Sequence, residues 1–233
     1  MKQFLLALFC LVALGLTAAD NASTKTSEQP RTYKSWSPFQ LGLFPGIPSY
    51  VNDSRVIGVK TGWPISSGLG STVDGFESSW IYSGTDRVNG LQASIFMDIS
   101  KYVIGFAPAG ALNINTREFI GFQAAPVMNL AGEITGLQAG AFNVAAVLNG
   151  YQPGVIGCIS REANGLQTAL FTVAKKLNGV QFSVVNVCGD VGDTFFQMGL
   201  VNVATKKHGI QLGLVNVIKD GWVPFLPFFN ICY

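Results

Sequence analysis

Few side chains in this 233-residue sequence have the types and spacing needed for catalysis or metal binding. The only histidine, His208, lies in a lysine-rich turn, where a solvated side chain is expected. Asp190 and Asp193 are close enough in sequence to bind a cation weakly, but the segment GDVGD lacks the spacing of a calcium loop. Gly68-Leu69-Gly70 has neither the spacing nor the βαβ context of a dinucleotide-binding loop. We therefore predict that the protein is not an enzyme and uses no metal or cofactor.

The composition excludes several other classes of protein. Hydrophobic residues make up 48% of the chain and charged residues 12%, which is the opposite of a disordered sequence. A net charge of +2 supplies no electrostatic footprint for nucleic acid. The 27 glycines and 17 phenylalanines favour a β-rich protein over a helical one.

The first residues resemble an export signal. A basic start, Met1-Lys2-Gln3, precedes an apolar run over residues 4–16 and the small residues Thr17-Ala18-Ala19. This order is typical of a secretory signal peptide. We predict a signal peptide at 1–19, a flexible polar leader at 20–38 and a β-repeat domain at 39–233, in a protein exported to the outer membrane or cell surface.

Three cysteines remain after cleavage of the signal: Cys158, Cys188 and Cys232. An odd number does not describe a disulfide framework. At most one disulfide is expected, and small apolar space-filling is the simpler role for these side chains.

The main signal is an internal repeat. A Gly-apolar-Gln motif or a variant of it begins at residues 90, 105, 121, 136, 150, 165, 179, 195 and 209, with less regular units at Gly58 and Gly75. An Asn follows five residues after the Gln in the clearest copies, GLQAGAFNVA (136–145) and GIQLGLVNVI (209–218). The repeat-defining polar residues are Gln92, Gln138, Asn143, Gln167, Gln181, Asn186, Gln197, Asn202, Gln211 and Asn216.

Each unit has the pattern of one β-strand and one turn. Apolar and polar residues alternate with a period of two, and frequent glycines oppose helix. Asn-Gly pairs such as Asn149-Gly150 and Asn164-Gly165 separate the units, as in type I′ hairpins. The charged residues fall between the units, and Asp98 is the main exception.

Two architectures fit these strands. The first is an antiparallel meander closed into an outer-membrane β-barrel of roughly 12 strands. Uncharged strands of nine or ten residues are long enough to cross a bilayer, which would make the lipid bilayer the partner. The alternating C-terminal residues Phe229, Ile231 and Tyr233 are a candidate signal for barrel assembly.

The second architecture is a parallel β-solenoid with one coil per repeat. Stacked coils would place the Gln and Asn side chains in ladders. The turns show no alternation in length between successive units, which favours the solenoid. We nevertheless favour the barrel, because a solenoid in water would expose much of the apolar surface.

The repeats also resemble a known family. The GLQxGLxN-type units, the opening segment QLGLFP (40–45) and the closing segment PFLPFFN (224–230) are similar to the bacterial surface-repeat proteins first named in spirochaetes. The resemblance covers roughly residues 39–233 and implies an envelope or surface protein without a defined activity.

Two functions follow from the two architectures. The barrel predicts a non-catalytic envelope protein with a structural or passive-pore role. The solenoid predicts a secreted or surface-displayed module for binding or adhesion, with the partner held on its Gln/Gly face. The protein partner cannot be read from the sequence.

Overall fold

The computed structural model describes residues 32–45, 47–205, 209–221 and 223–232, and their side chains except those of residues 190–194 and 232. The predicted signal peptide, His208 and Tyr233 lie outside the described residues.

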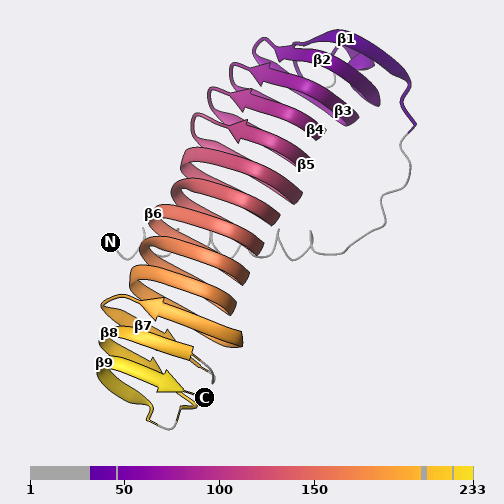
Figure 1. Cartoon of the computed structure of the whole chain (residues 1–233). Helices are drawn as coiled ribbons and strands as arrows, with labels where there is room; N and C mark the ends of the chain where they lie inside the picture. Colours follow the sequence, from indigo (N-terminus) through magenta and orange to yellow (C-terminus); the bar gives the residue numbers. More distant parts are fainter. Residues whose placement is uncertain (1–31, 46, 206–208, 222, 233) are drawn as a thin grey trace.

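The chain is an all-β solenoid of about 11 turns, stacked into an elongated column with β1 at one end and β9 at the other (Figure 1). The elements are β1 (Ser35–Gly42), the 3-10 helix η1 (Ser49–Val51), β2 (Ser54–Gly62), β3 (Ile65–Ser79), β4 (Tyr82–Ser94), β5 (Met97–Pro108), β6 (Leu112–Met198), β7 (Val201–Ala204), β8 (Gly209–Ile218) and β9 (Phe225–Cys232). β6 alone runs through several coils without interruption (Figure 1). β1 begins at Ser35, inside the segment predicted as leader.

The barrel that we favoured from the sequence is not the fold of this chain; the alternative, the solenoid, is. The strands of the sheet follow the order β1 to β9, and consecutive strands from β1 to β8 pair in parallel. A meander barrel requires antiparallel neighbours and closure of the first strand on the last. Here each coil hydrogen-bonds to the coils before and after it.

The register places equivalent positions of successive repeats beside one another. Gly58 pairs with Gly75, Gly75 with Gly90, Gly90 with Gly105, and Gly105 with Gly121. Phe195 and Gly209 show the same register near the C-terminus. The repeat starts found in the sequence therefore coincide with the steps of the solenoid, including the two irregular units.

The Asn-Gly pairs do not form the hairpins that we predicted. Asn149-Gly150 and Asn164-Gly165 lie within β6, where the chain continues without reversing. Their glycines do have positive φ, at 145° for Gly150 and 147° for Gly165. Asn149 and Asn164 do not have the positive φ that a type I′ turn requires, and the glycines belong instead to a stacked column.

Close packing of backbone on backbone explains why this column needs glycine. A Cβ atom added to Gly165 would lie 2.0 Å from the carbonyl oxygen of Gly150, and one added to Gly150 would lie 2.1 Å from that of Gly136. The obstacle is backbone, so no side chain can move aside. Positive φ in this region adds strain for any residue with a Cβ.

We predict that Gly165→Ala destabilises the solenoid by about 3 kcal/mol or more, because the clash and the strained φ act together. Gly221→Ala is the control, since its added Cβ would approach no atom more closely than 3.1 Å. Urea denaturation followed by circular dichroism measures both. Equal stabilities of the two variants would contradict the role of the glycine column.

An antiparallel strand closes the C-terminal end of the column. At the C-terminal end β9 runs antiparallel to β8 and lies across the last coil, with Asn230 opposite Gln211. Pro227 lies within β9 and has no N–H to offer another strand. Such a cap blunts an edge on which another chain could pair. Phe229 and Ile231, half of whose surface is exposed on β9, belong to this cap.

Candidate functional site

The Gln of the repeat lies inside the solenoid and forms a continuous ladder. Gln138 donates from its amide nitrogen to Oε1 of Gln123, and Gln152 donates in the same way to Gln138. The donor–acceptor distances along the ladder run from 2.7 to 3.2 Å. All members are buried: Gln123, Gln138, Gln152, Gln167, Gln181, Gln197 and Gln211. Gln92, two coils before Gln123, is buried too, and Ala107 occupies the position between them.

The Asn of the repeat forms a second buried ladder with the opposite direction of donation. The amide of Asn186 donates to Oδ1 of Asn202, which donates to Asn216, each at 2.7 Å. Asn143 contacts Sγ of Cys158 at 3.8 Å, so Cys158 occupies an Asn position in its own coil. Thr172 replaces Asn in the next coil and donates to Asn186.

Because of these ladders, the Gln and Asn side chains of the repeat cannot hold a binding partner, as the solenoid hypothesis had expected. A partner held on the Gln/Gly face would need these side chains at the surface, but they are buried and hydrogen-bonded to one another. The repeat-defining residues therefore build the scaffold, and the contact surface must lie on other side chains.

Sequence reasoning missed an ion pair that extends the Gln column toward β1. Lys60 and Glu77 are wholly buried, occupy the Gln positions of β2 and β3, and lie 3.8 Å apart. Nζ of Lys60 donates to Oγ1 of Thr85 at 2.7 Å, and Gln92 donates to Oε2 of Glu77 at 3.1 Å. Burial lowers the pKa of Lys60, and the charge of Glu77 opposes this. The sequence did contain one sign of this ion pair, because Gly75-Phe76-Glu77 has Glu where the repeat motif has Gln.

We predict that Gln167→Leu destabilises the protein by about 2–5 kcal/mol, because it leaves Oε1 of Gln152 and the amide of Gln181 without their ladder partners. Leu166→Gln, at the adjacent outward position, is the matched control and should cost less than about 1 kcal/mol. Thermal and urea denaturation measure both. A larger loss for Leu166→Gln would show that the ladder does not hold the coils together.

Asp98, the charge that the sequence placed inside a strand, occupies an Asn position. It pairs with Asn113 in register and is only 2% exposed. Burial raises the pKa of Asp98 to about 8, and the negative charge of Glu77 adds to the rise, whereas the hydroxyls of Ser94 and Ser83 oppose it. A protonated carboxyl group is uncharged, as the Asn amide is, and therefore costs less to bury than a carboxylate.

We predict that Asp98→Asn stabilises the protein, and increasingly so from pH 4 to pH 8. The pKa of Asp98 is raised in the folded state, so the folded chain holds a proton that the unfolded chain loses above about pH 4. Stability from this group therefore falls as the pH rises to about 8. The expected gain for the variant at pH 8 is about 2 kcal/mol or more. Urea midpoints at several pH values test this, and a difference independent of pH would contradict it.

The described cysteines are buried in different columns. Cys158 stands in the Asn column, and Cys188 pairs with Ala204 in the adjacent apolar column. Neither forms a disulfide with a described residue. Burial raises the pKa of Cys158 to about 12, which makes this thiol a poor nucleophile at neutral pH.

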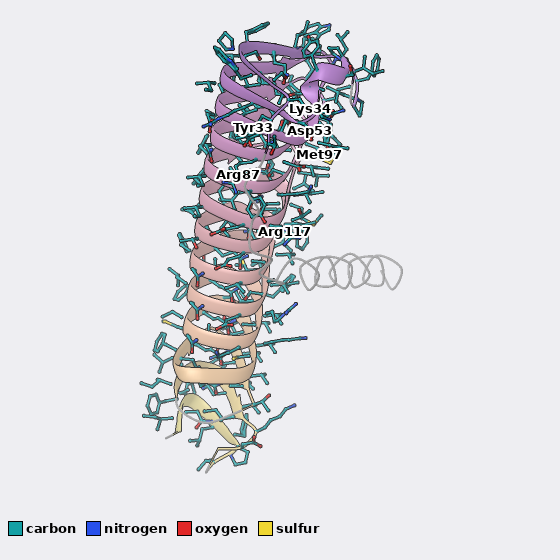
Figure 2. All side chains as sticks on the ribbon, turned by 90° about the vertical axis from the view of Figure 1, so that its right-hand side faces the viewer. Tyr33, Lys34, Asp53, Arg87, Met97 and Arg117 are labelled. Atoms are coloured by element: carbon teal, nitrogen blue, oxygen red, sulfur yellow. The ribbon has the colours of Figure 1, made fainter. Side chains whose placement is uncertain are left out.

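The turns that join one repeat to the next form a charged edge along the column. Its ion pairs include Arg55–Asp74 at 2.7 Å, Lys101–Asp86 at 2.8 Å and Lys176–Glu162 at 3.2 Å. Figure 2 shows side chains projecting from the stacked coils along their whole length, with Arg87 and Arg117 labelled. Because both signs of charge are present, this edge lacks the field that would select an acidic or basic partner. We define the charged edge by Arg55, Asp74, Asp86, Arg87, Lys101, Arg117, Glu118, Glu133, Arg161, Glu162, Lys175, Lys176, Lys219 and Asp220.

The turns inside each repeat form the opposite edge of the column. From the turn at residues 62–65 to the turn at residues 212–215, none of these turns carries a charged side chain. Large apolar side chains there are exposed, at 71% for Val155, 56% for Leu170 and 50% for Leu200. Small residues replace them in a few coils, such as Gly110 and Ala111. We define the apolar edge by Trp63, Trp80, Ile81, Ile95, Phe96, Val127, Val155, Ile156, Leu170, Val184, Leu200, Leu214 and Phe228.

A hollow of about 520 Å³ widens the apolar edge at its C-terminal end. Its lining is made mainly of apolar side chains and glycines: Ala169, Phe182, Ser183, Val184, Met198, Gly199, Leu200, Leu212, Gly213, Leu214 and Phe228. The hollow offers apolar contact and few polar groups, so it suits an apolar occupant.

The protein thus buries polar side chains and exposes apolar ones, which is the reverse of an ordinary globular protein. Among the described residues, more polar than apolar side chains are buried, because the ladders occupy the interior. Many large apolar side chains are left outside. Ordinary monomers rarely expose so continuous an apolar surface, and one of this kind marks an interaction site.

The described residues contain no cluster of metal-ligating side chains. No group of three or more His, Cys, Asp or Glu side chains there is placed to hold a metal ion. Within the same residues, no helix has the length and apolarity to cross a membrane.

Fold and surface together define the class of this protein as a β-solenoid with amide ladders inside and an apolar edge outside. No family model, curated protein or solved structure matches the chain. The similarity to the surface-repeat proteins therefore rests on the residues of the repeat and its flanking segments alone.

Proposed function

We propose that this chain is a non-catalytic protein of the bacterial envelope or cell surface, displayed as a β-solenoid and acting as a binding module. The observation that carries the proposal is the unpartnered apolar edge, which runs along a column whose repeat-defining polar residues are already used inside. A scaffold of this kind presents an extended surface, and each coil adds one row of side chains to it.

The signal-like N-terminus supports export of the protein, and the resemblance of its repeats supports a place on the envelope. That the module is non-catalytic stays a prediction from the sequence, where no enzyme motif was found. The edge accounts for many of the exposed apolar residues that led us to favour a barrel.

We predict that a cysteine on the charged edge is accessible from outside intact cells. Lys175→Cys, in a Cys232→Ser background, should react with a membrane-impermeant maleimide, since position 175 is exposed. The Cys232→Ser parent is the matched control and should stay unlabelled until it is denatured, because Cys158 and Cys188 are buried. Labelling of the Lys175→Cys variant only after lysis would overturn the proposed location.

A further inference from the structure

We infer that the apolar edge docks into a lipid bilayer, so that the column lies along the membrane surface with its charged edge in water. The inference deepens the proposed function, because it rests on the binding module and names the partner of its edge. The module would be an interfacial rod, held by one side, and none of its strands would cross the bilayer.

The cross-section of a coil is amphipathic in the required sense. The charged edge carries the charged side chains of the turns between repeats. The apolar edge carries no charged side chain from the turn at residues 62–65 to the turn at residues 212–215. Interfacial helices bind membranes with the same separation of an apolar face from a charged face. The solenoid repeats that separation coil by coil, over a length of about 50 Å at the usual strand spacing.

The backbone of this edge is already hydrogen-bonded, which removes the main cost of placing turns in hydrocarbon. N–H of Ile81 donates to the carbonyl of Pro64, N–H of Leu200 to that of Val184, and N–H of Val215 to that of Leu200. These bonds run between coils, so contact with lipid leaves them intact.

Side chains at the N-terminal end of the edge suit the membrane interface. The rings of Trp63 and Trp80 lie 4.2 Å apart, and more than half of each side chain is exposed. Tryptophan is enriched at the level of lipid headgroups. At the other end, the hollow beside Leu200 and Leu214 gives an acyl chain a place to pack.

A second copy of this chain is a poorer occupant. The edge is about 50 Å long and one or two side chains wide, so it offers about 500 Å² per partner. A stable protein–protein interface buries about 800 Å² on each side with shape complementarity. Lipid needs no such complementarity, because acyl chains adapt to a narrow edge.

Charge predicts how this binding should respond to salt and lipid. The charged edge holds paired acids and bases and faces away from the bilayer, so apolar insertion supplies the affinity. Binding to uncharged lipid should therefore persist at high salt, where electrostatic attraction is screened.

The test uses the mature full chain and vesicles of pure phosphatidylcholine in a flotation assay. We expect the protein to float with the vesicles at low and high salt. Val155→Glu/Leu200→Glu should lower the partition coefficient about tenfold or more, because two charges enter the edge. Lys175→Glu changes the net charge by the same amount on the charged edge and should stay within about twofold of wild type.

Two further measurements keep the test decisive. Circular dichroism and thermal unfolding must show that the double variant is folded, which the high exposure of both sites favours. Val155→Lys/Leu200→Lys should lose binding as well, since insertion depends on apolarity and not on the sign of charge. Tryptophan fluorescence of wild type should shift to shorter wavelength with vesicles.

Several outcomes overturn the inference. These are failure of wild type to float, equal binding of wild type and the folded double variant, and a dimer in solution that the double variant dissolves. Each of them leaves the proposed function standing if Lys175→Cys is still labelled on intact cells. Labelling confined to lysed cells removes the proposed function itself.

Discussion

From Gln138 to Gln211, each amide of the Gln ladder donates to the amide of the preceding coil, and this regular spacing constrains the rest of the structure. The bond forms only when successive coils stack in parallel and in register. Such stacking in turn brings the backbones of the glycine column into contact, where a Cβ atom would lie about 2 Å from a carbonyl oxygen. The glycines and the glutamines are therefore two parts of one requirement, the distance between coils.

The interior that results is narrow and polar. Most substitutes for Asn or Gln still bond within the column: Thr172 and Cys158 in one ladder, Lys60 and Glu77 in the other. Ala107, which occupies a Gln position, cannot. A buried polar network is stable when every member finds a partner, and costly when one does not. Asp98 is the costly case: both of its carboxyl oxygens are buried without a hydrogen-bond partner, and burial raises the pKa of this carboxyl group.

An interior filled with amides leaves the apolar residues of the repeat on the outside. The charged turns keep one edge in water, whereas the edge that includes Val155 and Leu170 stays apolar over most of the column. This division accounts for a hydrophobic composition in a chain whose core is largely polar. The Gln and Asn of the repeat are buried, so contacts with a partner are available at the turns inside each repeat.

The sequence by itself determined the β class, the repeat and its phase, because alternation and Gly-apolar-Gln spacing are local properties. It also placed most of the charges between the units and marked Asp98 as an exception, but it missed the buried pair Lys60 and Glu77. It did not determine whether neighbouring units run parallel or antiparallel, since a strand repeated every 14 to 16 residues fits both. Asn149-Gly150 favoured a hairpin for the same reason: positive φ at Gly150 suits a tight turn as well as a stacked glycine. Only the tertiary structure decided between them, because the inward direction of Gln138 and the outward direction of Val155 depend on which coils lie beside them.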